Sequence, residues 1–231
     1  MNTVSHSELQ ERIGYTFRNA QFLEQALTHR SYLNENPEWQ RDHNERLEFL
    51  GDAVLELIVT EYLYITHPNP EGELTNWRAA LVNANMLADI SGEFGLNDYI
   101  LLSKGESRDT GRARQYILAN AMEAVIGAIY LDGGYAPAKT FIERFVLTKL
   151  PTIIEHKLYR DAKSLFQEQA QERVGITPTY EVLEEWGPDH ARQFKVGVFL
   201  GKELVASGEG PSKQDAQQSA AERALTVKKW Q

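Results

Sequence analysis

One stretch of the sequence decides the fold: residues 44–59, which read NERLEFLGDAVLELIV. Apolar residues cover most of the surface that this stretch would have as a helix, and such a pattern predicts a helix buried in a core. Acids interrupt the apolar surface at intervals of three and four residues, so the helix stacks them along one face. These acids are Glu45, Glu48, Asp52 and Glu56.

Four acids on a core helix repel one another, and their removal from water is costly. A bound divalent cation would offset this cost, because hard cations bind carboxylate oxygens. A second apolar helix, predicted over residues 116–131, has one acid, Glu123, and one amide, Asn120. Since they are three residues apart, they share one face of that helix. Gly127 on the same helix predicts a close approach to a neighbouring helix.

The periodicity before residue 150 is helical throughout and predicts an all-α first domain over residues 5–134, with a helical extension to about residue 150. Two polar segments, 66–73 and 103–115, are predicted to be loops because they contain prolines, glycines or no apolar periodicity. Further helices are predicted over residues 74–82, 84–94 and 137–150.

The pattern changes after a short charged linker at residues 151–160. Residues 161–230 are predicted to form an α+β domain with the order α-β-β-β-α, because alternating apolar residues between two helical segments indicate strands. The predicted elements are a helix at 162–173, strands at 179–185, 192–200 and 203–209, and a helix that Ser212 caps.

Composition limits the function further. The chain has 231 residues with no cysteine, which excludes disulfides, zinc–thiolate sites and cysteine nucleophiles, and we expect a cytoplasmic protein. No apolar run is long enough for a membrane span, and the first eight residues do not predict a signal peptide.

The net charge of −9 would by itself argue against a nucleic-acid partner. The excess of acids lies in residues 1–159, with 22 Asp and Glu against 14 Lys and Arg; residues 160–231 have 11 against 10. An acidic cleft that holds a metal, next to a nearly neutral binding module, would give the same totals.

Together these features resemble the bacterial ribonuclease III family, whose members cut double-stranded RNA, and the resemblance covers nearly the whole chain. The strongest match is ERLEFLGDAV at residues 45–54. Supporting matches are ALTHRS at 26–31, Glu71-Gly72, and EAVIGA at 123–128. Residues 161–230 resemble a double-stranded-RNA-binding domain.

The resemblance implies a Mg²⁺-dependent endonuclease that also accepts Mn²⁺ and leaves 5′-phosphate and 3′-hydroxyl ends. It also implies a role in processing ribosomal RNA precursors, structured messenger RNA and transfer RNA. By the same resemblance, Asp52 and Glu123 are catalytic, and Glu48, Asn120 and Glu123 hold the metal. Glu45 and Glu71 match acidic positions that line the catalytic valley.

Asn120 departs from the family pattern, which usually has an aspartate at this position. An amide oxygen can bind a hard cation but adds no charge, so we expect weaker Mg²⁺ affinity. The alternative is a non-catalytic protein that binds double-stranded RNA and has a weakened metal site.

Phe49 has two interpretations. It could belong to the core of the domain, or, as the resemblance implies, it could pack into the partner subunit of a homodimer. The sequence alone does not separate them.

In the second domain, the resemblance implies RNA contacts by Gln167, His190 and Lys213. Gln214 and Gln217 stand where basic residues are common in such domains. Because Lys213 is then the one strong cation in its helical turn, we expect weak, salt-sensitive RNA binding.

Overall fold

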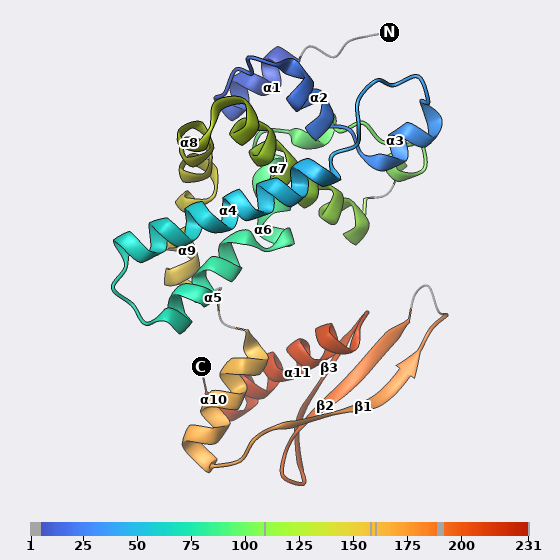
Figure 1. Ribbon diagram of the computed structural model, residues 1–231. Helices are drawn as coiled ribbons and strands as arrows, with labels where there is room; N and C mark the ends of the chain where they lie inside the picture. The colour runs from blue at the N-terminus through green and yellow to red at the C-terminus, as the bar shows by residue number, and fades with distance from the viewer. Residues whose placement is uncertain (1–5, 109, 158, 160, 189–191, 231) are drawn as a thin grey trace. The chain divides into compact units, whose positions relative to one another are not determined.

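The computed structural model describes residues 6–108, 110–157, 159, 161–188 and 192–230. The chain divides into two compact units, residues 1–159 and 160–231. The first unit is helical, and the second has a helix, three antiparallel strands and a helix (Figure 1). The predicted fold class is therefore confirmed. None of the described helices is both long enough and apolar enough to span a membrane.

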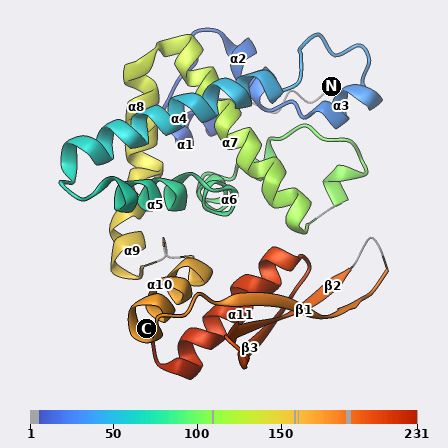
Figure 2. The same ribbon diagram turned by 60° about the horizontal axis from the view of Figure 1, so that its bottom comes forward.

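Two long helices, α4 and α7, form the centre of the first unit and pack extensively on each other (Figure 2). From Ala121 to Ile129, every residue of α7 except Glu123 is buried. The helices of this unit are α1 (His6–Ile13), α2 (Ala20–Ala26), α3 (Arg30–Glu35), α4 (Glu45–Thr66), α5 (Glu71–Val82), α6 (Ala84–Glu93), α7 (Arg112–Gly133), α8 (Tyr135–Phe145) and α9 (Leu150–Glu155), with short 3-10 turns at Leu96–Asp98, Glu106–Arg108 and Leu147–Lys149.

The start of α4 is fixed by the segment that precedes α3. The backbone N–H of buried Asn44 donates to the carbonyl of Thr28 at 2.9 Å, and its side-chain amide donates to the carbonyl of Ala26 at 3.3 Å. These bonds satisfy buried polar groups and hold the first turn of α4 in place.

The prediction that α4 is buried nearly all round is wrong. Phe49 is 81% exposed, Leu57 58% and Tyr64 80%, although the opposite side of the helix lies in the core. Together with Ala53 and Thr60, which are also exposed, they form a stripe along one side of α4. The apolar pattern of α4 cannot distinguish a side chain that packs in the core of its own domain from one that remains exposed on the surface, because both have the same composition.

Several predicted boundaries also need correction. Glu71 and Gly72 lie in the first turn of α5 rather than in a loop, because Pro70, with fixed φ, ends the connection and starts the helix. Helix α7 begins at Arg112, inside the predicted 103–115 loop, because an exposed first turn needs no apolar periodicity.

The predicted helix at 137–150 is α8, which begins at Tyr135, followed by a separate helix, α9. Helix α9 lies within the stretch predicted to be a linker, and its Ile153 is buried in the core of the first unit. Helix α9 has only six residues and contains Pro151, so its two buried residues, Leu150 and Ile153, give too weak a periodic signal to predict a helix.

The second unit contains α10 (Ala162–Val174), β1 (Thr179–Trp186), β2 (Gln193–Leu200), β3 (Glu203–Gly210) and α11 (Lys213–Lys228). The strands form an antiparallel sheet in the order β1-β2-β3. The predicted inward residues of β2 are confirmed, because Phe194, Val196, Val198 and Leu200 are buried on the face that the helices cover. Gly197, which the alternation predicts to face outward, is buried as well, because side chains of Leu183, Phe199 and Leu204 lie close to it. The side chain of Ser212 caps α11 by accepting the N–H of Asp215.

Candidate active site

The site forms where α4 and α7 touch backbone to backbone. A Cβ atom on Gly51 would lie 1.7 Å from the carbonyl oxygen of Glu123, and one on Gly127 would lie 2.3 Å from that of Leu47. Only glycine fits at such distances, so each helix contributes one glycine to the contact. The predicted close approach at Gly127 is therefore confirmed, and it sets Glu48 and Asp52, which flank Gly51, against Glu123.

The electrostatics of Glu123 show that these acids lie together. Burial raises the pKa of Glu123 to about 8, and the charges of Asp52 and Glu48 add to the shift. The pKa of Glu48 is also raised, first by burial and then by Glu45 and Asp52. Burial and nearby negative charge raise the pKa of a carboxylic acid when no cation lies beside it. In the described part of the chain, none of Glu48, Asp52 and Glu123 forms an ion pair.

The first and last of the four stacked acids on α4, Glu45 and Glu56, lie beside basic side chains instead. Glu45 lies 3.3 Å from the guanidinium of Arg30 and 3.7 Å from Nδ1 of His43. Glu56 lies 3.1 Å from Nε of Arg78. Of the four stacked acids on α4, Glu45 and Glu56 therefore have basic partners, whereas Glu48 and Asp52 have none among the described residues and lie near Glu123.

Asn120 is half-buried one turn before Glu123 on α7, so its amide lies on the same face of the helix. The ligand atoms that Glu48, Asp52, Glu123 and Asn120 can offer are carboxylate and amide oxygens, which suit a hard cation. Among the described residues, no group of three or more His, Cys, Asp or Glu side chains is placed so that it could hold a metal ion by itself. Mg²⁺ keeps several of its waters when it binds, so it needs fewer protein ligands than a site that surrounds the ion.

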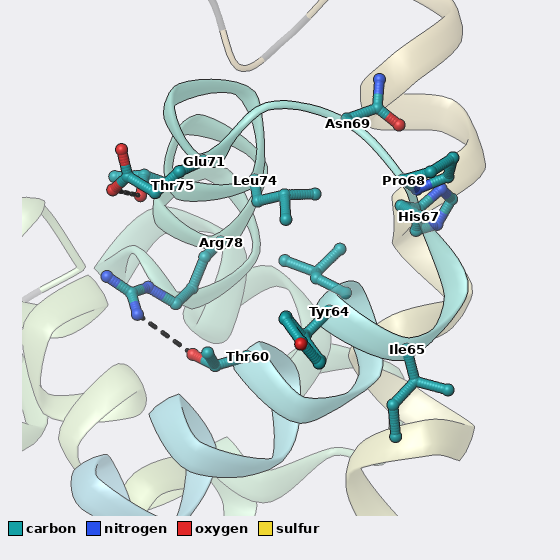
Figure 3. Close-up of a pocket in the computed structure, with 11 residues that line it drawn as sticks. Thr60, Tyr64, Ile65, His67, Pro68, Asn69, Glu71, Leu74, Thr75 and Arg78 are labelled. Carbon is teal, nitrogen blue, oxygen red and sulfur yellow. Dashed lines mark hydrogen bonds between the residues drawn. The ribbon is translucent and has the colours of Figure 1, made fainter.

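Glu71 is not brought to this cluster within one chain. Its carboxylate accepts the hydroxyl of Thr75 at 3.1 Å, and it lines a groove of about 770 Å³ between the end of α4 and the start of α5 (Figure 3). Across the groove, Arg78 donates to the hydroxyl of Thr60 at 3.0 Å. Glu71 does not contribute to the pKa shifts of Glu48 or Glu123.

Phe49 lies on the exposed stripe of α4, which rules out its interpretation as a core residue of the single chain. Phe49 lines a hollow of about 670 Å³ together with Leu47, Leu50 and Leu131, of which Leu131 is 50% exposed. The rest of the lining is polar: Gln25, Asp42, His43, Glu45 and Arg46.

The predicted RNA contacts of the second unit are only partly described. Gln167 is exposed on α10, and Lys213 is exposed at the first residue of α11, where its ammonium stands 5.7 Å from the ring centroid of Phe194. His190 lies outside the described residues.

Reasoning from sequence missed one residue of the candidate site, Gly51. It gave a signal, since a glycine inside a strongly helical stretch is unfavourable without a packing reason, and it pairs with Gly127.

Comparisons with known proteins agree with this organisation. Residues 19–150 match the family model described as ribonuclease-III-like, and residues 162–228 match the double-stranded RNA binding motif. The chain is 45% identical over 227 residues to ribonuclease 3 of Enterococcus faecalis, covering 97% of this chain and 98% of that one. It is 42% identical over 232 residues to ribonuclease 3 of Protochlamydia amoebophila, covering 98% and 95%.

A solved structure adds the fold of the first unit. The nuclease domain of ribonuclease III from Campylobacter jejuni, described as having structural flexibility in a region involved in dimer formation, matches with a TM-score of 0.57 and 40% identity. The match covers 64% of this chain and 99% of that one. From the two family models and the near-complete coverage of its relatives, the chain belongs to the ribonuclease III family of endoribonucleases.

Proposed function

We propose that this chain cuts double-stranded RNA by metal-dependent hydrolysis, leaving a 5′-phosphate and a 3′-hydroxyl. The observation that carries the proposal is the set of unpaired carboxylates around half-buried Glu123. A cluster that no base neutralises is costly to the folded protein, and such clusters are typical of functional sites. The double-stranded-RNA-binding motif of the second unit supports the choice of substrate.

In this proposal Glu48, Glu123 and the amide oxygen of Asn120 would hold Mg²⁺, or Mn²⁺ in its place. When bound, such an ion lowers the pKa of a coordinated water and stabilises negative charge on the phosphate. Asp52, exposed beside Glu123, orients the water that attacks phosphorus by accepting its hydrogen bond. As the water oxygen bonds to phosphorus and releases a proton to solvent, the bond from phosphorus to the 3′ oxygen breaks, and that oxygen takes up a proton from solvent. No side-chain nucleophile is required.

The direct test is incubation of a long RNA duplex with the purified protein and Mg²⁺, beside the Glu123→Gln variant. We expect short duplex products with 5′-phosphate ends from the wild type and none from the variant. If the wild type leaves the duplex intact, the alternative of a non-catalytic RNA-binding protein replaces this proposal.

We further propose that two copies of the chain form a homodimer through the exposed stripe of α4. Two-fold dimers use the same patch on both subunits, and Phe49 next to the hollow lined by Leu131 gives a self-complementary surface. The description of the Campylobacter jejuni nuclease domain refers to dimer formation. Two sites in one dimer would cut both strands of a duplex, and Glu71 could then line a valley shared by two subunits.

The Leu57→Glu variant is expected to be monomeric, because the substitution buries a charge in the proposed interface. Sedimentation velocity measures the change, and a dissociation constant raised by about 100-fold or more is expected. Val227→Glu on α11 is a matched control, since Val227 is 61% exposed and Leu57 58%. A Leu57→Glu variant that stays as dimeric as this control would contradict the proposed interface.

The substrates that fit are structured regions of ribosomal RNA precursors and messenger RNA, since the second unit belongs to a class that reads the shape of A-form RNA. Asn120 is the feature that favours the non-catalytic alternative. Against that alternative, Glu48, Asp52 and Glu123 all remain and lie together.

Asn120→Asp is expected to lower the Mg²⁺ concentration needed for half-maximal cleavage by about fivefold, because one more negative charge next to the cation contributes about 1 kcal/mol. A Mg²⁺ titration of duplex cleavage measures this shift. The titration should be made at pH 9, where protonation of Glu123 does not mask the gain. Coincident curves for the two proteins would show that position 120 does not contact the metal.

A further inference from the structure

Among the described residues of the second unit, four lysines form no ion pair, and two of these, Lys163 and Lys213, lie at the starts of the two helices. Elsewhere in the unit, Lys195 pairs with Glu184 and Lys228 pairs with Glu203. Lys163 in the first turn of α10 and Lys213 at the start of α11 form no ion pair with any residue that the structure describes. Their charges therefore remain available to a partner outside the chain.

Lys163 is held in a defined position although it has no acidic partner. Its ammonium donates to Oε1 of Gln217 at 2.8 Å and stands 5.2 Å from the ring centroid of Tyr180. Its backbone N–H donates to Oε1 of Gln218 at 3.1 Å. These contacts fix the ammonium against α11 without cancelling its charge, since an amide and an aromatic ring carry no net charge.

The contact of Lys163 joins two helix surfaces. Gln217 follows Lys213 by one turn of α11, and Lys163 precedes Gln167 by one turn of α10. The four side chains therefore form one continuous surface, which we name the two-helix face: Lys163, Gln167, Lys213 and Gln217. Both of its lysines are positioned over aromatic rings of the sheet, Tyr180 and Phe194.

We propose that Lys163 contacts an RNA phosphate and acts with Lys213 as the second cation of the two-helix face. This rests on the proposed binding of double-stranded RNA by the second unit. An ammonium that an amide holds can exchange that neutral acceptor for a phosphate oxygen, which forms a stronger, charge-assisted bond. The ammonium of Lys163 on α10 thus places a positive charge beside Gln217 on α11, although position 217 itself is uncharged.

The test uses the full chain, EDTA to prevent cleavage, and an RNA duplex longer than about 16 base pairs, the span of one such domain. Affinity is measured over a range of salt concentrations for four proteins. They are the wild type, Lys163→Gln, the exchange variant Lys163→Gln with Gln217→Lys, and Lys202→Gln. Lys202 is a matched control, because it lies in the β2–β3 turn, at the opposite end of the sheet from the start of α11.

We expect Lys163→Gln to bind about 3- to 10-fold more weakly and to reduce the slope of log affinity against log salt by about 0.9. The exchange variant returns the charge to the same place and should restore both values, while Lys202→Gln should match the wild type. If the slope of Lys163→Gln is unchanged, or the exchange variant does not recover, Lys163 is structural and the proposal fails. If the wild type itself does not bind the duplex, RNA binding by the second unit fails, and this proposal with it.

Discussion

Replacing Glu123 by glutamine is expected to abolish RNA cleavage and to make the metal-free protein more stable at neutral and alkaline pH. The raised pKa of Glu123, about 8, is the cause. Between its ordinary pKa of 4.5 and 8, the folded protein holds a proton on Glu123 that the unfolded chain has released. Rising pH therefore destabilises the folded state across this window, and above pH 8 the loss is complete.

Glutamine has nearly the same shape and no charge at any pH, so Glu123→Gln removes this loss. Because Glu123 is only half-buried, solvent screening reduces the gain to about 1–2 kcal/mol at pH 9. At pH 4 the two proteins should be nearly equal. Urea denaturation in EDTA at several pH values measures the difference.

Glu56→Gln provides the matched control on the other helix of the site. Glu56 already has an ion pair with Arg78, so its replacement should give no alkaline gain and a loss of up to about 1 kcal/mol. If the stability of the wild type and of Glu123→Gln changes with pH in the same way, Glu123 does not carry a raised pKa.

Under the proposed function, a bound metal would reverse the sign of the effect. A cation held by Glu123 must displace its proton at neutral pH, so Mg²⁺ should stabilise the wild type increasingly as the pH rises towards 8. The Glu123→Gln variant should gain much less from Mg²⁺. Titration calorimetry in buffers with different ionisation enthalpies would detect the released proton in the wild type. Binding of the proposed metal would therefore restore the folding stability that ionised Glu123 costs the metal-free protein.

The sequence was sufficient to single out the acids of the candidate site, because each is a polar residue in an apolar helix, which has few structural explanations; their catalytic and metal-binding roles stay predictions. It also predicted the order of elements in the second unit, since periodicity two and periodicity 3.6 are easily told apart. The exposed side of α4 could not be predicted in this way. Phe49 and Leu57 have the composition of core residues, and only the assembled chain shows that none of its other described segments covers them.

The proposed RNA contact of Lys163 was also beyond the sequence, because it depends on the packing of α10 against α11, and Lys163 and Gln217 are 54 residues apart in the sequence. The pairing of Glu45 with Arg30 and of Glu56 with Arg78 was missed for the same reason. A stripe of four acids contains no local sign of which members meet a base. Local patterns therefore identify candidate residues, whereas long-range packing decides which of them remain charged and unpaired.

The Gly51→Ala variant is expected to lose about 3 kcal/mol or more of folding stability, together with most of its cleavage activity. The new Cβ would lie 1.7 Å from the carbonyl oxygen of Glu123 and 2.9 Å from the backbone nitrogen of Gly127. Backbone atoms of a buried helix cannot rotate away as a side chain could, so α4 and α7 must separate. Separation by about 1 Å would move Glu48 and Asp52 away from Glu123 and could lower the rate about 100-fold.

Gly92→Ala on α6 makes this prediction a test of the close approach rather than of glycine itself. A Cβ on Gly92 would meet no atom within 4 Å, so alanine there should raise stability by about 0.5–1 kcal/mol through helix propensity. The same propensity favours alanine at position 51, and a loss there therefore measures the helix contact alone. Thermal unfolding of both variants, with duplex cleavage by each, gives the comparison. Equal stability changes at the two positions would mean that α4 and α7 do not need glycine to bring the acids together.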